Sequence, residues 1–191
     1  MKTKLAGLLL IAIGSCATIP AQSPQSEFWA HLSELCGRAF VGHVVSADPA
    51  DARFAGQPLI MHVRECARDE IRIPFHVGED RSRTWVITRM PAALRLKHDH
   101  RHEGGAEDGL SQYGGDTLGV GLSSRQEFPA DEFSKQLFRA NNIPASAENV
   151  WAIEVRSGDR FVYELRRPGR HFRVEFDLAV PAPAPPPWGA E

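Results

Sequence analysis

The chain has 191 residues, of which 42% are hydrophobic and 24% are charged, a balance typical of a globular protein with a hydrophobic core. Its formal net charge is −2 when the histidines are neutral. A net acidic chain is a poor electrostatic match for the phosphate backbone, so we do not expect nucleic acid as a partner.

The first 21 residues have the pattern of an export signal. A positively charged start precedes an apolar run, Leu5–Ile13, that is too short to span a bilayer. A cut after Ala21 would release the mature chain. Alternatively, Ile13-Gly14-Ser15-Cys16 resembles a bacterial lipoprotein box, in which Cys16 would carry the lipid. We therefore expect an exported protein, free in the periplasm or lipid-anchored to the cell envelope, with membrane contact only through a lipid on Cys16.

The chain has three cysteines, and only two would remain free for pairing in the mature protein. Cys16 is either removed or lipidated, which leaves Cys36 and Cys66. An even pair in an exported chain favours a disulfide, with two buried free thiols as the alternative.

A short helix is expected first, because Phe28, Trp29 and Leu32 follow Ser26 at helical spacing. From Arg38 onward the apolar period changes to 2, which predicts strands. Nine strands are expected: Ala39–Ala47, Leu59–Ala67, Glu70–His76, Arg83–Met90, Ala93–His102, Leu110–Tyr113, Asn149–Arg156, Arg160–Arg166 and His171–Leu178.

Two further features are assigned between and after these strands. A second helix is predicted over Pro129–Ala140, since proline suits a first helical turn. Gly114-Gly115 is interpreted as a break in a strand.

Short strands joined by tight turns predict a mainly β protein, an antiparallel meander of about nine strands. Such a set is expected to close into a barrel, because open sheet edges invite aggregation. The single domain is predicted to span residues 26–180. Pro181–Pro187 alternates proline with alanine and then runs through three prolines, so residues 181–191 are expected to form a disordered tail.

An N-terminal helix that leads into a glycine-containing first strand resembles the lipocalin-like small barrels in architecture. A second resemblance, to an uncharacterised family of exported bacterial proteins, covers nearly the whole mature chain and implies no activity. It rests on Phe28-Trp29, Ile73-Pro74-Phe75-His76-Val77-Gly78, Ser82-Arg83-Thr84-Trp85, His98–His102 and Tyr113-Gly114-Gly115-Asp116-Thr117.

The most chemically loaded stretch is Leu94–Glu103, where three histidines occupy every second position. On a strand, Leu94 and Leu96 would share a face with His98, His100 and His102, while the charged residues between them would face outward. This pattern predicts a strand that runs from the core to a polar opening. Isolated strand histidines, such as His43, His62 and His76, are interpreted as structural.

Imidazoles two residues apart can bind a divalent metal ion such as zinc. The candidate ligands are His98, His100, His102 and the nearby Glu107. The spacing of His100, His102, Glu107 and Gly114 matches part of the first cupin signature, although Leu94 stands where that signature has a glycine. The alternative is a polar strand end whose histidines are solvated or paired with carboxylates.

Three functional hypotheses follow. The first is an exported, non-enzymatic binding protein whose pocket is lined at one end by the histidine strand, with an unknown ligand. The second is a metal-dependent, cupin-like enzyme that uses His100, His102 and Glu107. The third is a structural or interaction protein of the cell envelope. No catalytic residue is assigned, since no nucleophile elbow, metalloprotease motif or phosphate loop is present.

Overall fold

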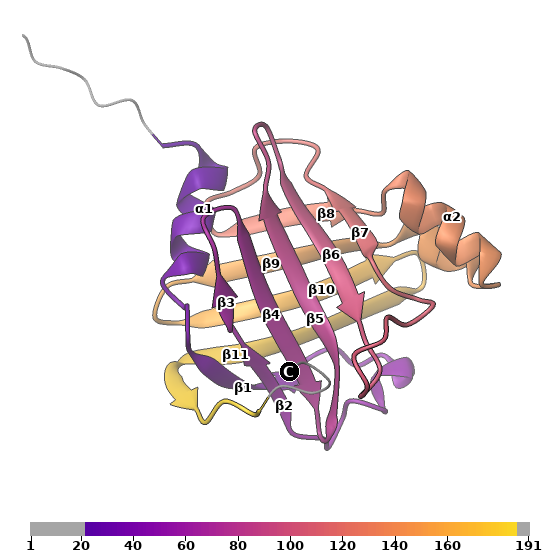
Figure 1. The fold of residues 1–191 in the computed structure, drawn as a ribbon, viewed down its shortest axis with the longest axis horizontal. Coiled ribbons are helices and arrows are strands. Elements are labelled where there is room, and N and C mark those ends of the chain that lie inside the picture. The colour runs from indigo at the N-terminus through magenta and orange to yellow at the C-terminus, as the bar shows by residue number, and fades with distance from the viewer. Residues whose placement is uncertain (1–21, 187–191) are drawn as a thin grey trace, which may run out of the picture.

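The computed structural model describes residues 22–186. The expected export signal, the lipoprotein box and the end of the proline-rich tail lie outside the described residues. Within them, one antiparallel sheet curls into a nearly closed barrel, with α-helices on opposite sides of it (Figure 1). The prediction of a mainly β, antiparallel barrel with two helices is confirmed. No helix of the described part is long and apolar enough to cross a membrane.

The sheet has 11 strands, so the expected number of about nine is wrong. In chain order they are β1 (Ala39–Val44), β2 (Leu59–His62), β3 (Glu65–Cys66), β4 (Glu70–Val77), β5 (Asp80–Arg89), β6 (Leu94–His100), β7 (Tyr113–Asp116), β8 (Arg125–Pro129), β9 (Val150–Arg156), β10 (Arg160–Arg167) and β11 (Arg170–Ala182). The hydrogen-bonded order is β7-β6-β5-β4-β2-β1-β11-β10-β9-β8, and β3 pairs with β4.

Two local features explain the difference in number. The expected strand Leu59–Ala67 is split into β2 and β3, because β2 stops pairing with β4 at Met61 and β3 resumes at Glu65. The strand β8 was missed: its short run pairs with β9 from Arg125 to Pro129. Pro129 therefore ends a strand and does not begin a helix.

The last strand is also longer than predicted. Its apolar side chains Phe172, Val174, Phe176 and Leu178 are buried, as the alternation indicates. Pairing then continues, because Pro181 and Ala182 lie opposite Phe40 and Ala39 of β1. The expected tail thus contributes its first two residues to the sheet.

The two ends of the sheet, β7 and β8, meet at a seam where Gly115 allows close backbone contact, while Gly114 allows it with the neighbouring strand β6. A Cβ on Gly115 would lie 1.8 Å from the carbonyl oxygen of Pro129, and one on Gly114 would lie 1.9 Å from that of Leu96. The amide of Asp131 donates to the carbonyl of Gly114 at 2.9 Å. The glycine pair therefore lies inside a strand, which corrects its interpretation as a break. It also moves the strand expected at Leu110–Tyr113 to Tyr113–Asp116.

The helices flank the barrel on opposite sides. Helix α1 (Pro24–Ser33) is capped by Ser23, whose hydroxyl accepts from the amide of Ser26, so Ser23 and not Ser26 is the cap. Its Phe28 and Leu32 are fully buried in the core. Helix α2 (Glu132–Ala140) is capped by Asp131, and a 3₁₀ turn, η2 (Pro144–Glu148), follows it. A second 3₁₀ turn, η1 (Pro49–Asp51), lies between β1 and β2.

A disulfide joins Cys36 and Cys66, with the two Cα atoms 6.2 Å apart, and confirms the predicted pair. It ties the segment after α1 to β3, across 30 residues of chain.

Candidate functional site

The largest cavity by volume among those described opens at the α2 side of the barrel and has a volume of about 610 Å³. It lies within the range of small-molecule sites. Residues of strands β4, β5, β6, β7, β9, β10 and β11 line it, together with Phe138 of α2 and Ser146 of η2. The cavity therefore extends from the aromatic core to the barrel mouth.

The histidine strand forms part of this lining, as predicted for its inner half. Leu94, Leu96 and His98 are buried, and His98 and His100 both line the cavity. The prediction fails at His102, because β6 ends at His100 and the His102 side chain is 63% exposed outside the cavity. The amide of His102 donates to the carbonyl of Ala106, so the chain turns away there.

His98 is held as a neutral imidazole of known tautomer. Its Nδ1 lies 3.1 Å from the carbonyl oxygen of Tyr113, which can only accept, so Nδ1 carries the hydrogen. Its Nε2 then accepts from the hydroxyl of Tyr163 at 2.7 Å. Complete burial lowers the pKa of His98 to about 3, and the nearby His100 adds to the effect.

His100 lies nearer to the opening and is also neutral. Burial lowers its pKa to about 4, and the guanidinium of Arg83 acts in the same direction. Its Nε2 lies 3.2 Å from the hydroxyl of Tyr113. Burial raises the pKa of Tyr113 to about 12, so this phenol keeps its proton and can donate to His100.

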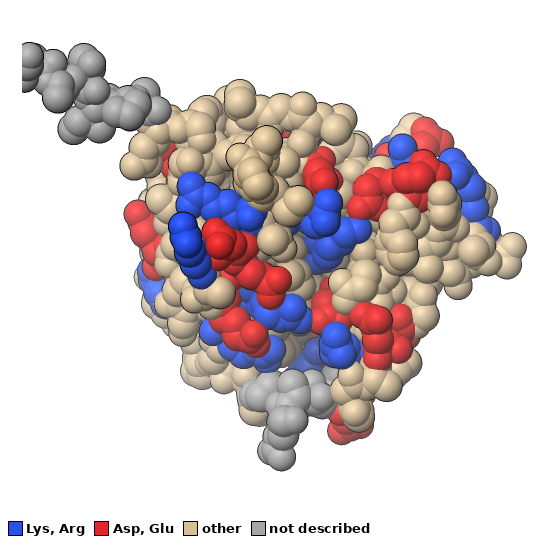
Figure 2. All heavy atoms as spheres, turned by 45° about the horizontal axis from the view of Figure 1, so that its top comes forward, with Lys and Arg blue, Asp and Glu red and all other residues tan. Residues whose placement is uncertain are grey.

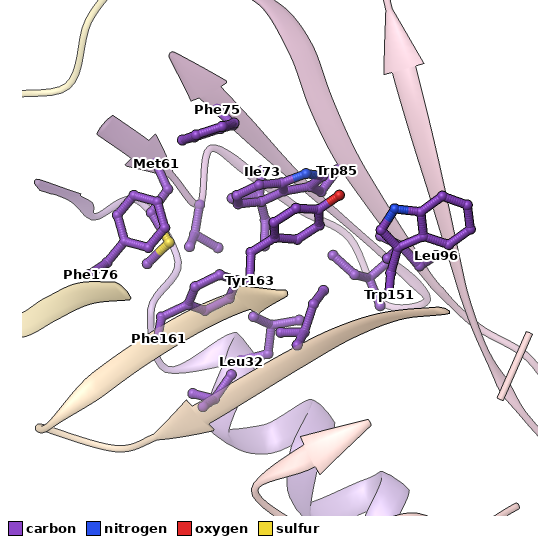
Figure 3. Close-up of a cluster of buried hydrophobic side chains, with 14 of the residues drawn as sticks. Leu32, Met61, Ile73, Phe75, Trp85, Leu96, Trp151, Phe161, Tyr163 and Phe176 are labelled. Carbon is purple, nitrogen blue, oxygen red and sulfur yellow. The ribbon is translucent and has the colours of Figure 1, made fainter. Parts of the chain in front are cut away.

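Stacked aromatic rings form the floor of the cavity. The ring of Trp85 lies over that of Tyr163, with centroids 4.3 Å apart, and it stacks on Phe75 at 4.8 Å. Trp151 lies beside them (Figure 3), 5.1 Å from the ring of His98. The buried Nε1–H of Trp151 has no hydrogen-bond partner among residues 22–186. The floor is thus a packed stack of aromatic rings with one buried donor left unsatisfied among the described residues.

Four arginines line the outer part of the cavity: Arg53, Arg83, Arg167 and Arg170. Arg83 is paired with Asp80 at 2.6 Å, and Arg170 is paired with Asp48 and Asp51. In the described part of the chain, neither Arg53 nor Arg167 has a carboxylate oxygen within 4.0 Å. The guanidinium of Arg167 donates to the side-chain carbonyl of Asn149 at 2.8 Å, and that of Arg53 lies over the ring of Phe54.

The lining also contains one carboxylate, Asp108. Its Oδ2 lies 3.5 Å from Nε2 of the exposed His102. Two unpaired guanidinium groups against this single acid leave the mouth with an excess of positive charge.

The predicted metal ligands are not gathered around one point. Over residues 22–186, no group of three or more His, Cys, Asp or Glu side chains is arranged to hold a metal ion. His98 and His100 face the cavity, whereas Glu107 accepts from Gln112 at 2.6 Å and from Ser111 at 3.3 Å. The set of His100, His102 and Glu107 needed for a cupin-like centre is therefore not assembled in this structure.

The charged residues that alternate with Leu94, Leu96 and the histidines form ion pairs on the outer wall of the barrel. Arg95 pairs with Asp116 at 2.6 Å and Lys97 with Asp131 at 2.5 Å. Asp99 is buried on this face, and Arg72 and Arg101 contact its carboxylate. The outward orientation predicted from the alternation is confirmed for Arg95 and Lys97.

Both histidines of the cavity lining, His98 and His100, were predicted from the sequence, but the residues around them were not. Tyr113, Tyr163, Trp85 and Trp151 have the alternation of buried strand residues, which does not distinguish a cavity wall from a filled core. The loop residue Arg53 has no sequence signal at all.

Comparisons of this chain with protein-family models, with curated proteins and with solved structures found no match.

Proposed function

We propose that this protein is an exported, non-enzymatic binding protein that holds a small molecule in the barrel cavity. The ligand has a flat apolar body and one anionic group, such as an aromatic carboxylate or sulfonate. The observation that carries the proposal is the composition of the cavity, with stacked aromatic rings at its floor and unpaired arginines at its mouth.

The apolar body would lie against the partly buried side chains of the lining, such as Tyr113 and Leu165, because burial of apolar surface favours binding. Arg167 and Arg53 would face the anionic group, because a guanidinium matches the geometry of a carboxylate or sulfonate.

The pKa values of the lining support binding more than proton transfer. A general acid or base works best when its pKa is near the working pH. Burial lowers the pKa of His98 to about 3 and raises the pKa of Tyr113 to about 12, so both side chains keep one protonation state around neutrality. Their hydrogen bonds position rings and hydroxyls for a ligand.

The test uses the fluorescent probe anilinonaphthalene sulfonate and its neutral analogue without the sulfonate. We expect the wild-type protein to bind the anionic probe. The bound probe should quench the tryptophan fluorescence of the protein. Arg167→Gln should weaken binding of the anion by about tenfold, the loss expected for one charge-assisted contact, and should leave the neutral analogue unaffected.

A matched control is Arg139→Gln, an exposed arginine on α2 that does not line the cavity. It should bind both probes as the wild type does. Absence of probe binding, or equal binding by Arg167→Gln and the wild type, would contradict the proposal and favour a structural or interaction role. Native mass spectrometry of protein from its own export compartment would then show whether a natural ligand is retained.

A further inference from the structure

A second hollow, of about 250 Å³, lies on the outer wall of the barrel. It is formed on strands β4, β5 and β6, which lie at the front of the barrel in Figure 1. On β4 the side chains of Ile71, Ile73 and Phe75 enter the core, so Arg72 and His76 project from the opposite face. The hollow is therefore separate from the barrel cavity.

His76 lies in this hollow in an unusual state. It is only 3% exposed although it is on the outer face of the sheet. Neither of its ring nitrogens has a hydrogen-bond partner in the described part of the chain. Buried polar groups in native proteins nearly always have a partner, supplied by protein, water or ligand. One N–H and one lone pair of His76, a lining residue of the hollow, are thus left without a partner among residues 22–186.

The imidazole is neutral at physiological pH. Burial lowers the pKa of His76 to about 4, and Arg81, His62 and Arg64 act in the same direction, opposed by Asp80. A neutral ring donates one N–H, so it can bind an acceptor without adding a further charge to the arginines.

The charged side chains of the hollow are four arginines, Arg64, Arg72, Arg81 and Arg101, against Glu65 and Asp99. On the face drawn in Figure 2, basic and acidic side chains lie interspersed. Asp99 already accepts from Arg72 at 2.5 Å and from Arg101 at 3.1 Å, and Glu65 accepts from Arg64 at 2.9 Å. Both acids are engaged, and the formal excess in the hollow is two positive charges, four arginines less two carboxylates.

Arg81 has the weakest carboxylate partner of the four. Its Nη2 lies 3.3 Å from Glu79, whose side chain is 97% exposed, and such solvated pairs contribute little. Its Nη1 donates to the backbone carbonyl of Pro186 at 3.2 Å. This contact fixes the guanidinium beside the hollow and leaves its charge without a buried counterion.

We infer that this hollow is a binding site for a small oxyanion of the phosphate type. The anion would accept from the N–H of His76 and from the guanidinium groups of Arg81 and Arg64. It would supply both the missing partner of the buried ring and the missing negative charge. This site is independent of the ligand proposed for the barrel cavity.

The test titrates the protein with inorganic phosphate at pH 7.5 and constant ionic strength, with chloride as the balancing ion. Isothermal calorimetry should show saturable binding, and the ring resonances of His76 should shift in the nuclear magnetic resonance spectrum. Arg81→Gln and His76→Gln should each weaken phosphate binding by about tenfold. Arg139→Gln removes an exposed arginine of α2 outside the hollow and should bind phosphate as the wild type does.

Two results would overturn the inference. One is the absence of saturable binding by the wild type at millimolar phosphate. The other is equal phosphate binding by wild type and Arg81→Gln. This result would show that water is the hydrogen-bond partner of the His76 ring and that phosphate binds elsewhere. The ring shifts are measured on the wild type, so the test does not depend on the folding of the His76 variant.

Discussion

The hydroxyl of Tyr163 donates to Nε2 of His98 across the barrel, from β10 to β6, over 2.7 Å. The other ring nitrogen of His98 donates to the carbonyl of Tyr113 on β7. A single imidazole therefore connects three strands of the barrel and fixes the cavity floor between them.

The first prediction concerns this hydrogen bond. Tyr163→Phe leaves Nε2 of the buried His98 without a donor, which should lower the free energy of unfolding by about 1–3 kcal/mol. Chemical denaturation monitored by circular dichroism measures the change. Tyr113→Phe is the matched control and should cost less, because its partner His100 is partly exposed and can bind water. Equal losses in the two variants would contradict the role given to Tyr163.

The second prediction concerns pH. Burial lowers the pKa of His98 to about 3 and the pKa values of His76 and His100 to about 4, against 6.5 for an ordinary histidine. Between pH 6.5 and 4 the unfolded chain binds protons that the folded protein does not, so stability falls as the pH falls through this window. The free energy of unfolding should fall by at most about 1.4 kcal/mol per pH unit for each fully buried group. Urea midpoints measured from pH 7.5 to 4.5 should decrease steadily, and His98→Gln should reduce the slope. A flat profile above pH 4.5 would contradict neutral, buried histidines.

The third prediction concerns the seam of the barrel. Gly115→Ala places a methyl group against the carbonyl oxygen of Pro129, at 1.8 Å before any adjustment. The backbones of β7 and β8 must separate, so we expect a loss of about 1–3 kcal/mol or more in stability. Thermal unfolding measures it, and Gly109→Ala is the control because nothing lies within 4 Å of its added Cβ. A Gly115→Ala variant as stable as that control would show that the β7 and β8 backbones can separate without loss of stability.

The fourth prediction concerns the disulfide. Cys36 and Cys66 are both exposed and close a loop across 30 residues, so reductant should reach the bond without unfolding. The chain-entropy account gives a contribution of about 3–4 kcal/mol for such a loop. The double variant Cys36→Ser/Cys66→Ser should show this loss in denaturant, and its stability should not change on addition of reductant. Equal stability of the oxidised wild type and the double variant would exclude a stabilising role.

Local pattern accounts for the part of the fold that the sequence predicted. The alternation of Phe172, Val174, Phe176 and Leu178 identifies β11 and its buried face, because side-chain direction along a strand depends only on position in the chain. The same rule places His98 and His100 toward the barrel interior. The pairing of Cys36 with Cys66 was also predicted from the sequence, since these are the two cysteines outside the expected export signal.

The remaining features depend on which segments meet in three dimensions. Gly114 and Gly115 have the composition of a strand break, but the close approach of β6 to Gly114 and of β8 to Gly115 requires glycine inside this strand. His102 continues the alternation in the sequence, yet it lies outside the cavity because pairing of β6 stops at His100. Arg83 and Arg167 are equivalent by residue type, but Asp80 neutralises only Arg83. Charge balance and cavity shape are set by contacts between distant residues, so the tertiary structure alone decides which of these side chains can meet a ligand.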